Sequence, residues 1–79
     1  MSSLGNFKPR EVEAVLFRAG FIIDTKSGSH RSYYHPIRKV HATIAFHPGT
    51  IPTGTLRAII RQTGMTGDEF LSYSKKRKY

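Results

Sequence analysis

The chain of 79 residues is long enough for one small domain, and its 38% of apolar residues can fill a single core. It has no cysteine, which excludes a disulfide framework and a thiolate metal site. No apolar run approaches the roughly 20 residues of a membrane span, and the N-terminus lacks the apolar core of a signal peptide, so a cytoplasmic protein is expected. Thirteen lysines and arginines against five acidic residues give a formal net charge of +8, which favours nucleic acid or an acidic protein as partner.

The first part of the chain predicts a helix. Residues Met1–Phe7 are rich in small polar residues and are expected to fray, whereas Pro9 suits the first turn of a helix because its missing N–H would have no partner there. The helix is predicted over Arg10–Ala19, and Gly20 ends it in the left-handed conformation. Apolar residues recur along it at helical spacing: Val12, Val15, Leu16 and Ala19.

A β-hairpin is predicted next, with strands over Phe21–Lys26 and His30–His35. The Ser27-Gly28-Ser29 segment between them is typical of a tight turn, because Gly28 accepts positive φ and serines can bond their own backbone. His30 is therefore expected where the turn becomes a strand.

A third strand is predicted over Val40–Phe46, after a turn at Pro36–Lys39. If that turn has four residues, His30 lies opposite Ala45. The face of the sheet away from the helices then carries His30, Ser32, Tyr34, His41 and Thr43. A turn one residue longer reverses the alternation and directs His30 into the core. The sequence leaves this register open.

The last part of the chain predicts two more helices. A loop over His47–Pro52 is followed by Thr53 as N-cap of a helix that Gly64 ends. The apolar positions of this helix are Leu56, Ile59, Ile60 and Thr63. Thr66 and Glu69 fit a capping box, so a short third helix is expected there. Its apolar residues are Phe70 and Leu71.

Together these elements predict an α+β domain of two layers: a helix, three antiparallel strands, a helix and a short C-terminal helix. The single domain is expected to span residues 1–79, with its core over 8–73 and a basic tail over 74–79. The tail, and Lys75–Lys78 in particular, is expected to be a disordered and solvated end.

His30 is the residue whose chemistry suits the charge of the chain. Imidazole has an ordinary pKa of about 6.5 and can take or give a proton near neutrality. With Lys26 and Arg31 close in sequence, it could act on a phosphodiester. A polar residue beside a turn with no chemical role is the alternative, and spacing alone favours that alternative.

Five short segments carry a family likeness in the same order and at the same spacing: Arg18–Phe21, Gly28–His30, His47–Gly49, Ile51–Arg57 and Gly64–Thr66. In these segments, over roughly residues 8–73, the chain resembles the HicA mRNA interferase toxins of prokaryotic toxin–antitoxin modules. It departs from many of them at Thr50-Ile51, where they carry a charged residue after the His-Pro-Gly segment.

The resemblance implies a double-stranded-RNA-binding-like fold and an activity that cleaves RNA with the Gly-Ser-His histidine, which is His30 here. It also implies a HicB-like acidic antitoxin that covers this histidine. Cleavage through the 2′-hydroxyl of the RNA needs no metal, so neither a metal nor a small-molecule cofactor is expected. The other residues that we expect to contact RNA are Lys26, Ser29, Arg31, Tyr34, Lys39 and Arg57.

The sequence also allows other interpretations of its function. A non-catalytic domain that binds double-stranded RNA would fit the charge and the order of elements equally well. A DNA-binding subunit fits less well, because the helices show no helix-turn-helix pairing. His35, His41 and His47 suggest a metal site, but carboxylates are scarce and cysteine is absent. By alternation, Tyr33 and Tyr34 face opposite sides, so only one of them can stack on a base.

Overall fold

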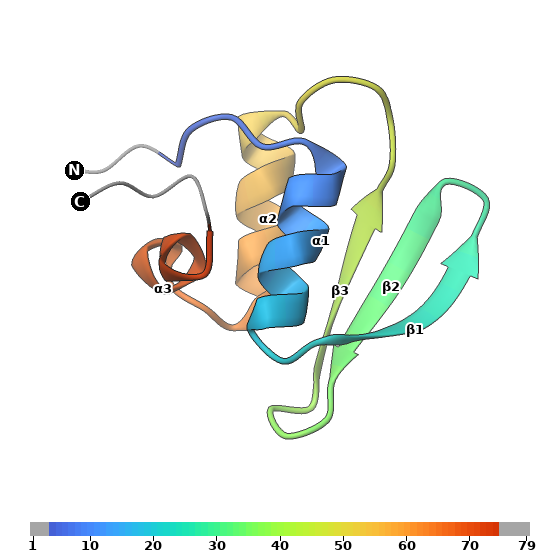
Figure 1. The fold of residues 1–79 in the computed structure, drawn as a ribbon, viewed down its shortest axis with the longest axis vertical. Helices are drawn as coiled ribbons and strands as arrows, with labels where there is room; N and C mark the ends of the chain where they lie inside the picture. The colour runs from blue at the N-terminus through green and yellow to red at the C-terminus, as the bar shows by residue number, and fades with distance from the viewer. Residues whose placement is uncertain (1–3, 75–79) are drawn as a thin grey trace.

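The computed structural model describes residues 4–74, which form a three-stranded sheet with helices packed on one of its faces (Figure 1). The elements follow one another as α1 (Pro9–Arg18), β1 (Ile22–Ser27), β2 (His30–His35), β3 (Val40–Ala45), α2 (Thr53–Thr63) and α3 (Gly67–Ser72). The strands are antiparallel and lie in the order β1-β2-β3. The predicted α+β fold is confirmed. The predicted basic tail at Lys75–Lys78 lies outside the described residues.

The helices begin and end close to the predicted positions, with one correction. Thr66 caps α3 as expected, since its Oγ1 accepts the Glu69 N–H at 3.0 Å. The prediction that Thr53 caps α2 is wrong: Thr53 is already helical, and Pro52 is the N-cap with no capping side chain. The reason is that the Pro52 carbonyl accepts the Leu56 N–H at 2.9 Å, so the first helical hydrogen bond starts one residue earlier.

The register of β2 against β3 is the one that a four-residue turn produces. His35 pairs with Val40, and His30 pairs with Ala45. Side chains at alternate positions therefore face the helices or the open side of the sheet. In β1 the pairing slips between Ile23 and Thr25, which is a bulge in the edge strand.

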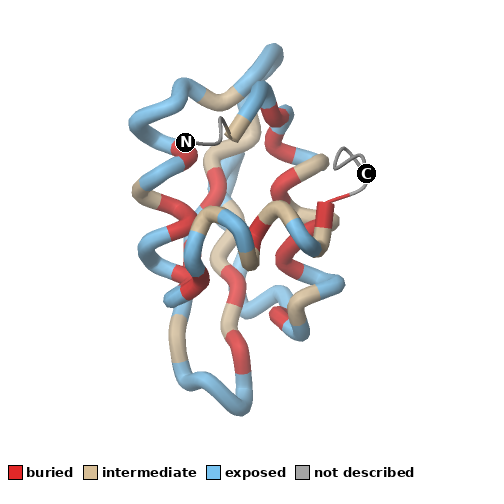
Figure 2. The backbone as a smooth tube through the Cα atoms, turned by 90° about the vertical axis from the view of Figure 1, so that its left-hand side faces the viewer, coloured by how far each residue is buried: buried red, intermediate tan, exposed pale blue. Residues whose placement is uncertain are grey.

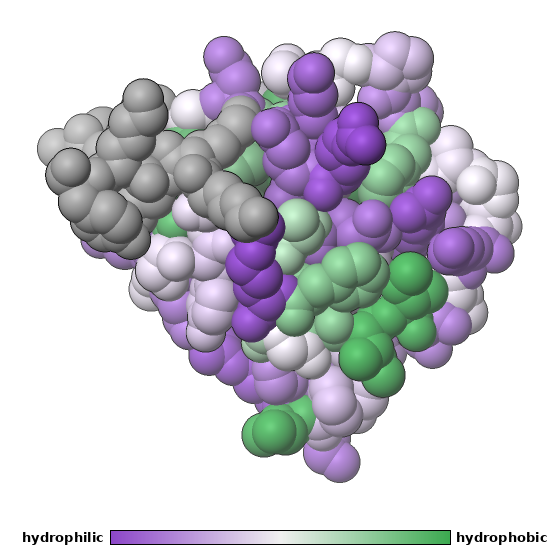
Figure 3. Space-filling model, viewed as in Figure 1, coloured by the Kyte–Doolittle hydropathy of each residue, from purple (hydrophilic) through white to green (hydrophobic). Residues whose placement is uncertain are grey.

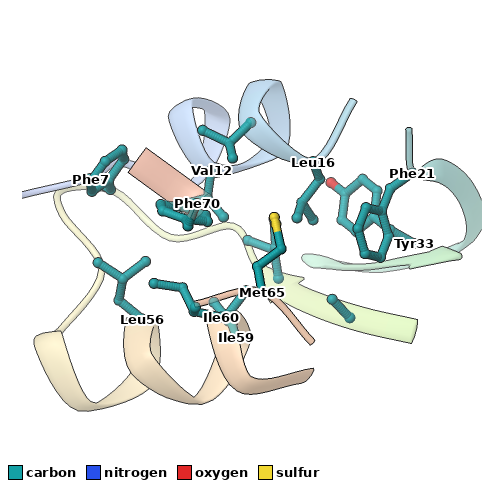
Figure 4. Close-up of a cluster of buried hydrophobic side chains, with 13 residues drawn as sticks. Phe7, Val12, Leu16, Phe21, Tyr33, Leu56, Ile59, Ile60, Met65 and Phe70 are labelled. Atoms are coloured by element: carbon teal, nitrogen blue, oxygen red, sulfur yellow. The ribbon is translucent and has the colours of Figure 1, made fainter. Parts of the chain in front are cut away.

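Buried side chains from every layer meet in one core between the sheet and the helices (Figure 4). Its members are Phe7, Val12, Val15, Leu16, Phe21, Tyr33, Ala42, Ile44, Leu56, Ile59, Ile60, Met65 and Phe70. In Figure 2 these buried positions recur along the helices and strands, separated by exposed ones.

The expectation that the N-terminal segment frays through Phe7 is wrong. Phe7 is 1% exposed, and its ring meets that of Phe70 edge to face with the centroids 5.3 Å apart. The Phe7 carbonyl also accepts the Ile51 N–H at 2.7 Å. Burying a side chain of this size stabilises the fold by about 1.5–3 kcal/mol, which outweighs the flexibility that its small polar neighbours favour.

Apolar side chains also lie outside the core. Phe17 on α1 and Ile22 and Ile23 on β1 are exposed, and Figure 3 shows a hydrophobic area over α1 and the first part of β1. Because β1 is one edge of the sheet, this area borders a strand whose outward backbone groups have no neighbouring strand within residues 4–74.

Candidate active site

His30 is exposed on the open face of the sheet, at the first position of β2. A two-residue turn, Gly28 and Ser29, precedes it, and Gly28 has φ of +59°, a conformation that favours glycine. The register places His30 on the same face as Ser32, Tyr34, His41 and Thr43, and none of these side chains is buried. The sequence left open which face of the sheet carries His30. The four-residue turn before β3 fixes the register that directs His30 away from the core.

The turn that carries His30 is tied to the end of β3. The Phe46 N–H donates to the Ser29 carbonyl at 2.7 Å, just beyond the pairing of His30 with Ala45. The guanidinium of Arg31 lies over the Phe46 ring, 4.1 Å from its centroid. These contacts hold the backbone on both sides of His30, while its side chain stays accessible.

Arg31 points to the other side of the sheet from its neighbour His30. Its Nη1 donates to Glu13 Oε2 of α1 at 2.9 Å, and the Tyr33 hydroxyl donates to the same carboxylate oxygen. The hydrogen bond with Glu13 raises the pKa of the Arg31 guanidinium, against a smaller opposing effect of desolvation. Burial, together with the bond to Glu13, raises the pKa of the Tyr33 hydroxyl above its ordinary value. Arg31 and Tyr33 thus join the sheet to α1.

The remaining histidines have separate surroundings. His35 is 8% exposed; its Nε2 lies 3.0 Å from the Ala19 carbonyl, and its Nδ1 accepts the backbone N–H groups of Ile37 and Arg38. These bonds require a neutral ring with the proton on Nε2. Within residues 4–74 no three His, Asp or Glu side chains gather into a metal-binding group.

His41 lies on the open face, where it contacts two other polar side chains. Its ring meets that of Tyr34 with the centroids 4.7 Å apart, and its Nε2 lies 3.7 Å from Asp24 Oδ2. Four residues along β2 separate Tyr34 from His30, which is about 13 Å at the rise of an extended strand. This aromatic pair therefore lies farther along the face that carries His30.

The other residues predicted to contact RNA are spread over the molecule. Ser29 adjoins His30 in the turn, and Lys26 is exposed in β1 at the position paired with Arg31. Lys39 is at the opposite end of β2, in the turn before β3. Arg57 is exposed on α2, in a shallow hollow that Leu4, Ile60 and Gly67 also line. The structure therefore brings Ser29 and Tyr34 onto or beside the open face with His30. Lys26 faces the same side as its partner Arg31, away from His30, and Lys39 and Arg57 lie elsewhere.

Two cations that the sequence did not single out lie near the same end of the molecule as His30. Lys8 and Arg10 are exposed at the start of α1, and they line a hollow with Phe46 and His47. Figure 1 shows the start of α1, the end of β3 and the β1–β2 turn at one end of the fold. Nothing in the sequence links residues 8–10 to residues 46–49, because only the packing of α1 beside the loop brings them together.

Comparison with known protein families gives a match for most of the chain. The family described as HicA toxin of bacterial toxin-antitoxin matches residues 9–65 of the chain. The chain belongs to this HicA toxin family. The match covers α1, all three strands and α2, and it includes the turn that carries His30. No curated protein gives a match.

Membership of the HicA family confirms the resemblance found in the sequence and makes the chain a toxin of a bacterial toxin–antitoxin system. The fold agrees with it, since the segments that carried the resemblance lie at the end of α1, in the β1–β2 turn, in the loop after β3 and at both ends of α2. Among residues 4–74, no helix has the length and apolar character needed to cross a membrane.

Proposed function

We propose that the protein cleaves RNA, with His30 as the group that transfers a proton at the scissile phosphodiester. The observation that carries the proposal is the placement of His30 at the open face of the sheet, on a backbone held from both sides. A side chain in this position reaches a polymer that lies across the face. The net charge of +8 supports a polyanionic substrate, and the toxin family supports an activity that harms the cell.

The chemistry uses the 2′-hydroxyl of the substrate as nucleophile. A base removes the proton of this hydroxyl, the 2′-oxygen forms a bond to phosphorus, and the bond from phosphorus to the 5′-oxygen breaks as that oxygen takes up a proton. The products are a 2′,3′-cyclic phosphate and a free 5′-hydroxyl. His30 supplies either the base or the acid, and one such group contributes about 10²–10⁴-fold to the rate. A slow nuclease results, which suffices for a toxin.

Residues around His30 are proposed to bind the RNA substrate. Ser29 adjoins it in the turn and Tyr34 offers an aromatic face farther along β2, while Lys26 is exposed in the edge strand β1, on the side that Arg31 faces. Base stacking on aromatic side chains tolerates many sequences. Arg31, Lys39 and Arg57 add to the positive electrostatic potential of the protein. Lys39 and Arg57 lie away from His30, so they would contact phosphates farther from the cleaved bond.

The first test is an assay of the purified protein on single-stranded and duplex RNA in the presence of EDTA. Cleavage that continues in the chelator and leaves 2′,3′-cyclic phosphate ends supports the proposal. Purified His30→Ala protein, prepared in the same way, controls for contaminating nucleases. Binding without cleavage would favour the non-catalytic double-stranded-RNA binder instead, and activity that needs a divalent ion would contradict the metal-free chemistry.

The antitoxin is proposed to be a small acidic protein of the HicB type that covers His30 and its surroundings. Charge complementarity with a toxin of +8 should speed association more than it adds affinity. Hydrogen exchange with and without the partner tests this, and protection over Ser27–Arg31 is expected. Neutralisation that leaves this segment as exchangeable as before would contradict covering of the site.

A further inference from the structure

Three side chains from three different strands meet on the open face, farther along the sheet from His30. Tyr34 and His41 are cross-strand partners on β2 and β3, and their ring centroids lie 4.7 Å apart. Nε2 of His41 lies 3.7 Å from Oδ2 of Asp24 on β1. Because β2 separates β1 from β3, this contact passes over β2. Asp24, Tyr34 and His41 form what we call the open-face cluster, and the proton transfer described above makes no use of it.

A bulge in β1 brings Asp24 to this face. The pairing of β1 with β2 slips between Ile23 and Thr25, so Asp24 is the extra residue. Thr25 pairs with Ser32 and lies on the open face, and the contact of Asp24 with His41 places Asp24 on the same side. Bulges occur often beside functional sites, where they redirect a side chain. The bulge in β1 thus directs a carboxylate over the open face.

Asp24 differs from the other acidic residues of the chain. The remaining four lie on helices: Glu11, Glu13, Asp68 and Glu69. Two of those carboxylates bond arginines at 2.9 and 2.7 Å, whereas the 3.7 Å between Asp24 and His41 is too long for a hydrogen bond. Within residues 4–74 the Asp24 carboxylate accepts no hydrogen bond. Its oxygens therefore keep their capacity to accept from a ligand.

The surroundings of the carboxylate suit a flat ring. Ile22 pairs with Tyr34 and is 55% exposed, so an apolar side chain, a phenol and an imidazole form a row across the three strands. Proteins that bind single-stranded RNA stack unstacked bases on such side chains. Stacking tolerates any base, but a carboxylate beside the ring accepts only from N–H groups and so distinguishes one base edge from another.

Guanine offers the best edge for this carboxylate. Its N1–H and its 2-amino group are adjacent donors, and the two oxygens of one carboxylate can accept from both. Cytosine and adenine present an amino group beside an acceptor nitrogen, and uracil presents one N–H between two carbonyl oxygens. The negative charge of Asp24 also repels phosphates, which favours a base over the RNA backbone at this position.

The open-face cluster and His30 can contact the same RNA strand. Four residues of β2 separate Tyr34 from His30, which is about 13 Å and too far for both to contact the cleaved phosphodiester. Ser32 and Thr43 form the cross-strand pair between them, with their hydroxyls 3.4 Å apart. These hydroxyls can bond the sugar or phosphate of an RNA that passes along β2 from His30 to the cluster.

We propose that the open-face cluster binds a guanine base of the RNA at a fixed distance from the bond that His30 cleaves. The proposal rests on the proposed function, because it takes the open face as the path of the RNA, and it adds the base that determines where the cut falls. Tyr34 and His41 contact the ring of the base, and Asp24 accepts from N1–H and the 2-amino group.

Binding of uncleavable RNA tests the proposal without the chemistry. Oligouridines with G, A, C or U at the central position are methylated at every 2′-oxygen, which removes the nucleophile of the reaction. The wild type is expected to bind the G oligonucleotide about fivefold or more tightly than the U oligonucleotide, the lower end of the range for a bidentate contact to a base. Equal affinity for all four oligonucleotides overturns the proposal.

Substitution of the carboxylate should remove this preference. Asp24→Asn is expected to reduce it to about twofold or less, because an amide presents a donor where guanine needs an acceptor. Asp68→Asn is the matched control, since it removes the same charge from an exposed position on α3, on the helix side of the sheet. Asp68→Asn should keep the full preference. Full preference in Asp24→Asn, or its loss in Asp68→Asn, overturns the proposal.

The aromatic contact is tested separately. Tyr34→Ala should weaken binding of all four oligonucleotides by about fivefold, the lower end of the range for one stacked base, because the ring is partly exposed. Phe17→Ala is the control, because it removes an exposed ring from α1 on the helix side. Phe17→Ala should bind as the wild type does, and equal losses in the two variants overturn the proposal.

Cleavage maps on an RNA of random sequence distinguish this proposal from the proposed function. The wild type should cut at a constant number of nucleotides from a guanine, and Asp24→Asn should cut without that bias. If the wild type cuts with no guanine at a fixed distance, the guanine site fails and the proposed function stands. If it cuts no RNA but prefers the G oligonucleotide through Asp24, the proposed function fails and the guanine site stands. If Asp24→Asn keeps the RNA preference but escapes neutralisation by the antitoxin, the cluster belongs to the protein partner, which overturns the proposal.

Discussion

The two faces of β2 carry the same kinds of residue in opposite roles. On the helix side, Tyr33 and His35 are buried and Arg31 is paired with Glu13. On the open side, His30 is exposed, and Tyr34 is partly exposed with its ring against that of His41. The helix side thus binds its polar groups into the fold, whereas the open side has exposed contacts such as those of Ser32 with Thr43 and of His41 with Asp24, and leaves His30 accessible.

The two histidines show this difference most clearly. Both nitrogens of His35 have backbone partners, and its ring packs edge to face on Phe21 with the centroids 5.1 Å apart. A Cβ on Gly20 would lie 2.8 Å from Nε2 of His35, so the ring also determines which residue can end α1. His35 therefore connects the end of α1 to the sheet, whereas His30 has no such structural task in the described contacts.

The largest expected effect is a difference in stability between variants of Tyr33 and variants of Tyr34. Tyr33→Ala removes a fully buried ring and should lower the free energy of unfolding by about 3–5 kcal/mol, which is a large share of the stability of a small domain. Tyr34→Ala removes a partly exposed side chain and should change that free energy by about 0.5 kcal/mol or less. Urea unfolding of both variants measures this, and equal losses would contradict the assignment of the faces.

The second prediction concerns alkaline pH and the helix side. The folded protein holds the pKa of Tyr33 above its ordinary value of about 10, so the unfolded chain loses the phenol proton first as pH rises. The contribution to stability is therefore complete below pH 10 and is lost progressively above it. Tyr33→Phe should show a weaker decline in stability above pH 10 than the wild type. Thermal unfolding across this range tests it, with Tyr34→Phe as the control that keeps the full decline.

The third and smallest effect concerns Lys26 and Arg31, the two cations that are close to His30 in the sequence and paired with each other across β1 and β2. Lys26 has an exposed side chain, so Lys26→Ala should reduce the salt slope of binding to single-stranded RNA by about 0.7, the value for one lost phosphate contact. Arg31→Ala should reduce it less, because the guanidinium is bonded to Glu13. Titrations at several salt concentrations with uncleavable RNA measure both slopes. A larger change for Arg31→Ala would mean that this residue leaves Glu13 to bind phosphate.

The fold could be predicted because its signals are local. Helical spacing identified α1 and α2, and the pair Thr66 and Glu69 identified the short third helix. The placement of His30 needed one further fact, the length of the turn before β3, since one residue more would have reversed the faces. The position of Arg31 follows from the same register, although proximity in sequence had grouped it with His30.

Other features depended on contacts between distant segments. Phe7 is in the core because Phe70 and the loop after β3 lie against it, and its small polar neighbours indicated the opposite. The hollow of Lys8 and Arg10 likewise forms only when α1 and the loop after β3 meet. Such a site has no periodic pattern in the sequence from which to predict it.

The central claim is that the open face carries the chemistry through His30. The most direct measurement is the rate of RNA cleavage by His30→Ala protein that melts at the wild-type temperature. We predict a fall of about 100-fold or more, the loss expected for one acid–base group, with the RNA affinity largely retained. A folded His30→Ala protein that cleaves RNA as fast as the wild type would contradict the account.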